Sequence, residues 1–137
     1  MKVLFADSTS LNRYGITLLA KQCSTTLEVL EAESLQEVIS ILATEDISIL
    51  FLHVSILEKK AIKKIQKVKN SQEQLQIILV SKNKFDHVAK MSFIDLFDGI
   101  LYLEDTVENT RDHIENFLND NLSTHKQKFS IRSYALT

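Results

Sequence analysis

An apolar run that stops at an imidazole, residues 47–53, constrains the fold of this chain more than any other stretch. Its sequence, Ile-Ser-Ile-Leu-Phe-Leu-His, is rich in β-branched and aromatic side chains and has no helical period. This pattern is typical of a strand buried on both faces, as found in parallel sheets covered by helices. Ligands of open parallel sheets collect outside the carboxyl ends of the strands. The last residue of the run, His53, is therefore the first candidate functional residue.

The rest of the chain alternates between short apolar runs and segments of helical period. The runs predict five strands, at 2–6, 26–32, 47–53, 76–80 and 100–103. Amphipathic segments predict a helix after each strand, at about 11–19, 35–42, 56–68, 85–93 and 107–118. Such alternation predicts parallel strands joined by right-handed crossovers. We therefore expect an α/β fold, a doubly wound five-stranded parallel sheet with helices covering both faces.

Local signals mark the ends of several predicted elements. Ser34-Leu-Gln-Glu37 is a capping box that opens the second helix, and Asp105-Thr-Val-Glu108 supplies a cap for the last one. Asp98-Gly99 predicts a turn before the fifth strand. In the first helix the apolar positions Leu11, Tyr14, Leu18 and Leu19 are expected to cover the sheet.

Composition narrows the class of protein. A chain of 137 residues is one domain by length, and its formal charge of -2 gives no basic excess of the kind that nucleic-acid binders carry. With no proline and only two glycines, it lacks the glycine-rich loops that cradle nucleotide phosphates. The single Cys23 excludes an internal disulfide and is interpreted as a small packed hydrophobe rather than a reactive thiol.

The first residues carry no targeting signal. Only four apolar residues separate Lys2 from Asp7, which is too short for a signal peptide or a membrane span. We therefore expect a cytoplasmic protein with no membrane contact.

Polar residues at the predicted strand ends carry a family resemblance. Asp7 follows the first strand, His53 ends the third and Ser81 follows the fourth, at separations of 46 and 28 residues. Residues 1–120 resemble a response-regulator receiver domain of the NarL/LuxR type, with a CheY-like (βα)5 flavodoxin-like fold. In that family an acidic pair binds magnesium, an Asp accepts a phosphoryl group, and a hydroxyl residue and a Lys complete the site. The resemblance places Asp7 at the acidic pair and Ser81 at the hydroxyl position.

Three positions of the resemblance depart from the family pattern. Ser8 stands where the second acid is expected, His53 where the phosphoacceptor Asp is expected, and Leu103, with Glu104 as the neighbouring option, where the Lys is expected. Magnesium is held by carboxylates and water rather than by imidazole, and an acid in place of the ammonium repels a phosphoryl group. We therefore expect a degenerate receiver that is not an enzyme, undergoes no aspartyl phosphorylation and binds magnesium weakly or not at all.

Each candidate residue has a structural interpretation beside the functional one. For His53 we favour a partly buried imidazole that caps the strand end and hydrogen-bonds Asp7 or Ser81; phosphohistidine chemistry, metal binding and pH sensing are the alternatives. For Asp7 and Ser81 we favour capping and loop hydrogen bonds over catalysis.

Lysines are concentrated in the third predicted helix. We interpret them as a solvated helix face, with an acidic partner or a nucleic acid as the alternative. The residues are Lys59, Lys60, Lys63, Lys64, Lys67 and Lys69.

The last residues differ from the rest of the chain. No acidic residue follows Asp120, which indicates that 121–137 is a linker or tail. Tyr134-Ala-Leu-Thr137 resembles the opening of a LuxR-type helix-turn-helix domain. The sequence thus predicts the N-terminal regulatory module of a transcription regulator that acts by dimerisation or by binding a protein partner, and reaches DNA only through an attached helix-turn-helix domain. The alternatives are a stand-alone binding adaptor and a residual phosphoacceptor receiver.

Overall fold

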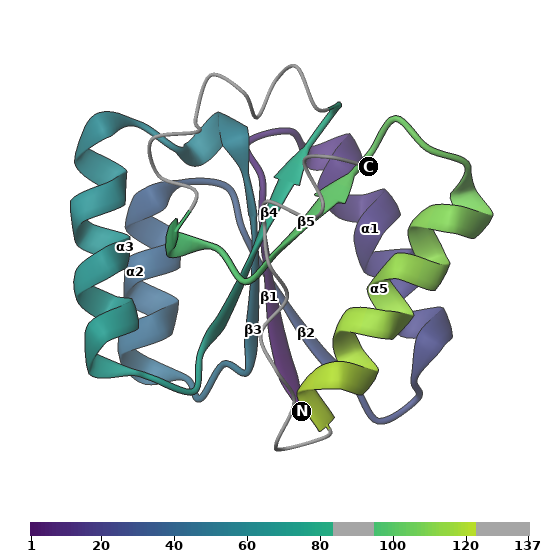
Figure 1. Ribbon diagram of the computed structural model, residues 1–137, viewed down its shortest axis with the longest axis horizontal. Helices are drawn as coiled ribbons and strands as arrows, with labels where there is room; N and C mark the ends of the chain where they lie inside the picture. Colours follow the sequence, from purple (N-terminus) through teal and green to yellow (C-terminus); the bar gives the residue numbers. More distant parts are fainter. Residues whose placement is uncertain (84–94, 123–137) are drawn as a thin grey trace.

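Five parallel strands form one sheet in a computed structural model, which describes residues 1–83 and 95–122 (Figure 1). The strand order is β2-β1-β3-β4-β5, and every neighbouring pair is parallel. The strands are β1 (Lys2–Ala6), β2 (Glu28–Ala32), β3 (Ile49–His53), β4 (Gln76–Ser81) and β5 (Gly99–Tyr102). The predicted doubly wound sheet is confirmed.

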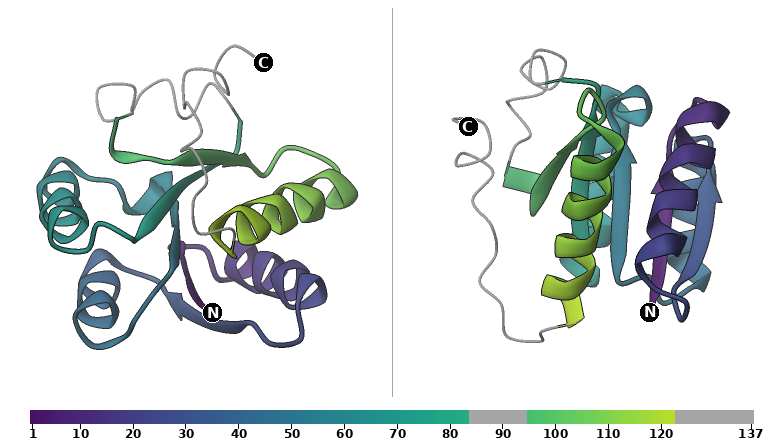
Figure 2. Two further views of the ribbon diagram at one scale, coloured as in Figure 1. Left: turned by 60° about the horizontal axis from the view of Figure 1, so that its bottom comes forward. Right: turned by 90° about the vertical axis from the view of Figure 1, so that its right-hand side faces the viewer.

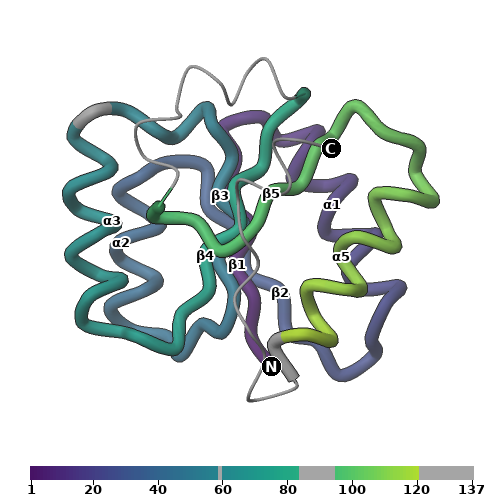
Figure 3. Tube along the Cα trace, viewed as in Figure 1, coloured from purple at the N-terminus to yellow at the C-terminus, as the bar shows by residue number. Residues whose placement is uncertain are grey.

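Helices cover the sheet on both faces and complete three layers (Figures 1 and 2). The helices are α1 (Ser10–Cys23), α2 (Leu35–Thr44), the short 3-10 helix η1 (Val54–Ile56), α3 (Lys59–Ser71) and α5 (Val107–Leu122). The traces of α1 and α5 run side by side on one face, and those of α2 and α3 on the other (Figure 3). The helix predicted at 85–93 lies outside the described residues. Within the described ranges, no helix is long and apolar enough to cross a membrane.

The central strand β3 contributes to both hydrophobic cores. Leu50 and Leu52 pack on the α2 and α3 side, whereas Ile49 and Phe51 pack on the α1 and α5 side. This alternation follows from the period of two in a strand. The Phe51 ring stacks on Phe5, with ring centroids 4.5 Å apart. The prediction of a strand buried on both faces is confirmed, although the strand begins at Ile49 rather than at residue 47.

Both predicted helix caps are present, but the capping residue of α5 differs from the prediction. Ser34 Oγ accepts a hydrogen bond from the Glu37 N–H (3.2 Å), which confirms the cap of α2. In α5 the cap is Thr106, whose Oγ1 accepts from the Asn109 N–H (3.1 Å). Asp105 instead accepts from the Asn109 side chain and the Thr106 N–H, and these hydrogen bonds hold the pKa of its carboxyl below the ordinary value.

The chain bends at Asp98 directly before β5, where the sequence predicts a turn, and a buried ion pair stands at this bend. Asp98 is buried, and its Oδ2 accepts from Lys69 Nζ (2.7 Å) and from the Ile77 N–H (2.9 Å). Lys69 Nζ also donates to the Leu75 carbonyl, so this lysine leaves the solvated face to which the sequence pattern assigned it. The ion pair ties the end of α3 to the starts of β4 and β5.

Gly99 serves a close approach rather than a turn. It is the first residue of β5, and a Cβ added there would lie 2.7 Å from Phe117 Cε1 of α5. Because that distance is shorter than any ordinary carbon contact, only glycine lets α5 pack on β5 as it does.

The face of α1 that packs on the sheet is not the predicted one. Ile16, Thr17 and Ala20 are the buried residues of α1, whereas three of the positions expected to cover the sheet are exposed. These exposed positions are Leu11, Tyr14 and Leu18.

Removing the buried anion should destabilise the fold strongly. In Asp98→Ala the ammonium of Lys69 keeps its buried position without its partner, so we expect the free energy of unfolding in urea to fall by about 3–5 kcal/mol. Lys60→Ala, an exposed change on the same helix, is the matched control and should alter it by less than about 0.5 kcal/mol. A loss below about 1 kcal/mol in Asp98→Ala would contradict the role assigned to the pair.

Candidate functional site

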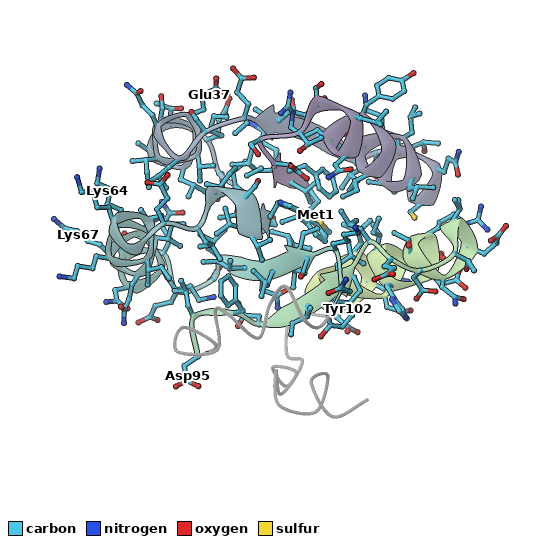
Figure 4. The ribbon with its side chains drawn as sticks, turned by 90° about the horizontal axis from the view of Figure 1, so that it is seen from above. Met1, Glu37, Lys64, Lys67, Asp95 and Tyr102 are labelled. Carbon is cyan, nitrogen blue, oxygen red and sulfur yellow. The ribbon has the colours of Figure 1, made fainter. Side chains whose placement is uncertain are left out.

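The predicted site residues meet at one edge of the sheet, where the carboxyl ends of the parallel strands lie. Ala6 pairs with Leu52, His53 with Val80 and Ser81 with Tyr102, so the strand ends are in register across the sheet. Asp7 directly follows β1, and Leu103 and Glu104 follow β5. Figure 4 looks down on this edge of the molecule, with Tyr102 labelled at the end of β5.

Asp7 is buried and holds the loop that leads into α1. Its Oδ1 accepts from the Thr9 N–H (2.8 Å), and its N–H donates to the Ala32 carbonyl (3.0 Å). Its own carbonyl accepts from the Arg13 guanidinium. The predicted loop hydrogen bonds are therefore present, whereas the N-cap of α1 is Thr9. The second carboxylate oxygen, Oδ2, is buried with no hydrogen-bond partner among the described residues.

His53 caps the 3-10 turn that follows its strand. The Ser55 N–H donates to His53 Nδ1 (3.0 Å), and a ring nitrogen that accepts a hydrogen bond carries no proton. Asp7 Oδ1 lies 3.7 Å from the same Nδ1, which is too long for the hydrogen bond predicted between them but close enough for an ion pair whenever the ring is protonated.

Ser81 is fully buried at the end of β4. Its Oγ donates to the Asn83 carbonyl (2.7 Å), and its own carbonyl accepts from the Leu103 N–H (2.8 Å). The hydroxyl therefore closes the loop after the strand, as the structural interpretation predicted.

The remaining positions carry other groups than the resemblance expects. Leu103 packs partly buried against the core under α1 and α5, and Glu104 is exposed. The Ser8 N–H donates to Ser55 Oγ (3.2 Å). An apolar side chain thus occupies the place where the resemblance expects an ammonium, and no positive charge comes from that position.

Ser55 is the residue that sequence reasoning missed. Its N–H donates to His53 Nδ1 and its Oγ accepts from the Ser8 N–H, so it joins the loops after β1 and β3. A short hydroxyl residue two positions past a strand end is a common local hydrogen-bonding signal, and it could have identified this one.

The site offers few ligands for a metal. The described ranges contain no group of three or more His, Cys, Asp or Glu side chains that could hold an ion. Asp7 Oδ2 suits Mg²⁺, but the imidazole of His53 does not, since Mg²⁺ takes oxygen ligands. These residues therefore do not fit a receiver-type magnesium site.

Two further candidates lie away from this edge. Lys60, Lys63, Lys64 and Lys67 are exposed on α3, and Figure 4 shows Lys64 and Lys67 projecting away from the sheet, which confirms the predicted solvated face for these four. Cys23 is partly buried at the end of α1, where its Sγ contacts the Leu19 carbonyl and burial raises its thiol pKa. A raised pKa lowers the thiolate fraction and agrees with a packed rather than a reactive cysteine.

The chain matches no protein-family model and no curated protein. Solved structures do share its fold. The RcsB response regulator of Salmonella typhimurium superposes with a TM-score of 0.74 at 22% identity, covering 99% of this chain and 66% of that one. The isolated receiver domain of RcsB from Salmonella enterica serovar Typhimurium, determined with the phosphomimetic BeF3-, has a TM-score of 0.72 at 22% identity and covers 100% and 99% of the two chains.

A more distant structure gives the same result. The CheY-like receiver domain protein of Methanospirillum hungatei superposes with a TM-score of 0.69 at 11% identity, covering 90% of this chain and 98% of that one. At such identities the likeness establishes the CheY-like fold, and the chemistry has to be argued from the site itself.

Replacing His53 tests whether it is a structural cap. His53→Ala removes the acceptor for the Ser55 N–H and should lower the free energy of unfolding by about 1 kcal/mol. His53→Asn keeps an acceptor on a short side chain and should recover most of that loss in chemical denaturation. Equal loss in both variants would show that the hydrogen bond to Ser55 is not what His53 contributes.

Proposed function

We propose that this chain is a degenerate receiver domain that works without phosphorylation and regulates transcription as the N-terminal module of a NarL/LuxR-type response regulator. Two findings support this. The fold is that of receiver domains, and the RcsB structure that it resembles comes from a study of how that regulator interacts with DNA. In that structure the chain superposes on 66% of the RcsB polypeptide, which leaves room for a further domain in RcsB.

The proposal depends mainly on the imidazole of His53 at the position of the phosphoacceptor. A receiver accepts a phosphoryl group on a carboxylate at this strand end, whereas here an imidazole occupies the position and its Nδ1 is engaged by the Ser55 N–H. The two groups that would assist transfer are also replaced, one by Ser8 and the other by Leu103. With Asp7 as the one fitting ligand, the pocket lacks the charges that hold Mg²⁺ and stabilise a transferring phosphoryl group.

In this proposal, contact with another protein molecule regulates the module in place of phosphorylation. The module would pair with a second copy or with a protein partner through a helix face, and so set the distance between two attached helix-turn-helix domains. DNA recognition belongs to those domains, in keeping with the net charge of -2 on this chain.

Phosphoryl donors and their mimics provide the direct test. With acetyl phosphate and magnesium the intact mass should stay unchanged, and beryllofluoride with magnesium should leave the melting temperature unchanged. A mass gain of one phosphate, lost in His53→Ala or Ser81→Ala, would refute the proposal and identify the acceptor.

A restored variant is the positive control for that test. The triple change Ser8→Asp, His53→Asp and Leu103→Lys returns the three missing groups to the edge and should gain a response to beryllofluoride, because the fold that positions them is intact. The single change His53→Asp should not respond, since it restores neither the second acid nor the ammonium.

The link to transcription has its own test. A reading frame that continues past residue 137 into a helix-turn-helix is expected. Deletion of residues 1–120 from that regulator should change the output of its target promoters, and an unchanged output would contradict the regulatory role. A reading frame without a helix-turn-helix would favour the stand-alone adaptor.

A further inference from the structure

The positive charge of the chain is concentrated on one helix. The 13 residues of α3 include six lysines and no acid, although acidic side chains outnumber basic ones in the whole chain. Inside the fold, Lys69 pairs with Asp98. Figure 4 shows Lys64 and Lys67 pointing away from the sheet. Four lysines of α3 are exposed, and we call them the α3 lysine face: Lys60, Lys63, Lys64 and Lys67.

The lysines of the α3 lysine face repel one another within a single copy. Each of them has two others three or four residues away, and no acid at either distance. Side chains at these spacings are neighbours on a helix, and like charges there destabilise it. None of the four forms an ion pair with another residue of the described ranges. A solvated helix face ordinarily mixes both signs of charge, so the fold of one copy does not account for this arrangement.

The composition of this surface selects the class of partner. The other exposed residues between 60 and 71 are Gln66, Asn70 and Ser71, so no exposed side chain there is apolar, aromatic or an arginine. Centres of protein–protein interfaces are enriched in aromatic residues and arginine and depleted in lysine. A helix that lies on a membrane needs exposed apolar side chains, and single-stranded nucleic acids are bound by stacking on aromatic rings. The closely spaced phosphates of a double helix need only the charges.

We propose that the α3 lysine face binds the phosphate backbone of double-stranded DNA without reading its sequence. From Lys60 to Lys67 the helix rises about 10 Å, and duplex DNA carries about six charges over that length. A lysine binds phosphate as a point charge on a flexible stem, so four phosphates can pair with the four ammonium groups. Binding also removes the repulsion within the face, because each lysine gains an opposite charge.

The net charge of -2 does not oppose this contact, because the acids lie elsewhere. Exposed Glu108, Asp112 and Glu115 belong to α5, and the sheet separates α5 from α3 (Figure 3). Charges farther apart than the Debye length, about 8 Å at physiological ionic strength, are largely screened. Phosphate contacts position a protein on DNA and carry no sequence information. The choice of DNA over an RNA duplex rests on the proposed function, in which an attached domain holds DNA.

Fluorescence anisotropy of a labelled DNA duplex of about 20 base pairs, titrated with the full chain, tests the binding. At about 50 mM salt the dissociation constant should be on the order of 10⁻⁵ M, as for sequence-independent binding. The logarithm of the association constant should fall linearly with the logarithm of the salt concentration, with a slope of about -3 to -4 for four phosphates. Duplexes of unrelated sequence should bind equally.

Two double variants of equal net charge separate the α3 lysine face from the charge of the whole chain. Lys63→Gln with Lys67→Gln should raise the dissociation constant at least about tenfold and reduce the salt slope by about two, one for each lost phosphate contact. Lys21→Gln with Lys82→Gln changes exposed lysines outside α3 and should leave both quantities nearly unchanged. Lys63→Arg with Lys67→Arg keeps the charges and should bind at least as tightly as the wild-type chain.

The melting temperature without DNA is the folding control. Lys63→Gln with Lys67→Gln leaves one like-charge pair, Lys60 with Lys64, and glutamine is as good a helix former as lysine. This variant should therefore melt no lower than the wild-type chain, so a loss of DNA binding is not a loss of folding. A lower melting temperature would contradict the repulsion assigned to the face.

Three results would overturn the inference. The first is no DNA binding by the wild-type chain even at the lowest salt, and the second is an equal loss in the two glutamine variants. The third is tighter binding to polyglutamate, to vesicles of phosphatidylserine and phosphatidylcholine, or to an RNA duplex than to DNA. None of these results involves the phosphorylation pocket. A response of the wild-type chain to beryllofluoride would instead refute the phosphorylation-independent function and leave the α3 lysine face standing.

Discussion

The central strand β3 has no water-exposed face, and the position of every other element follows from that constraint. Leu50 and Leu52 require cover on one side and Ile49 and Phe51 on the other, so helices must lie on both faces of the sheet. Phe51 contacts Phe5 in β1 and Phe117 in α5, which joins two strands and a helix through three rings. A parallel sheet of this kind directs the ends of its strands to one edge, and that edge is where the mostly buried His53 ends β3.

The edge has the geometry of a ligand site, and a serine, an imidazole and a leucine stand at three positions where the resemblance expects other groups. Its polar atoms form local hydrogen bonds: the Ser55 N–H donates to His53, the Ser81 hydroxyl donates to the Asn83 carbonyl and the Thr9 N–H donates to Asp7. Such loop hydrogen bonds stabilise the strand ends. The polar groups that make them are already paired within the chain. Away from this edge, the outer face of α1 carries exposed apolar side chains.

The fold could be predicted from the sequence because its signals are local. The apolar run at 47–53 and the capping box at Ser34 each determine the structure of the residues that form them or lie next to them. The errors concern contacts between distant segments: Lys69 and Asp98 are 29 residues apart, and Gly99 is fixed by a ring of α5. The outward face of α1 was missed for another reason. The helix carries apolar residues on two faces, and periodicity alone does not say which face the sheet takes. For the site, the sequence identified the positions that meet at the edge, but not Ser55 as the partner of His53.

The central claim is that contact between copies, and not occupancy of the edge pocket, sets the state of this module. Sedimentation equilibrium of the full chain, with and without beryllofluoride and magnesium, measures the contact between copies and its dependence on the pocket in one experiment. The fraction of dimer should be the same in the two conditions at every protein concentration. A dimer that forms or dissolves only when beryllofluoride and magnesium are present would contradict the claim, because the pocket would then control the interface.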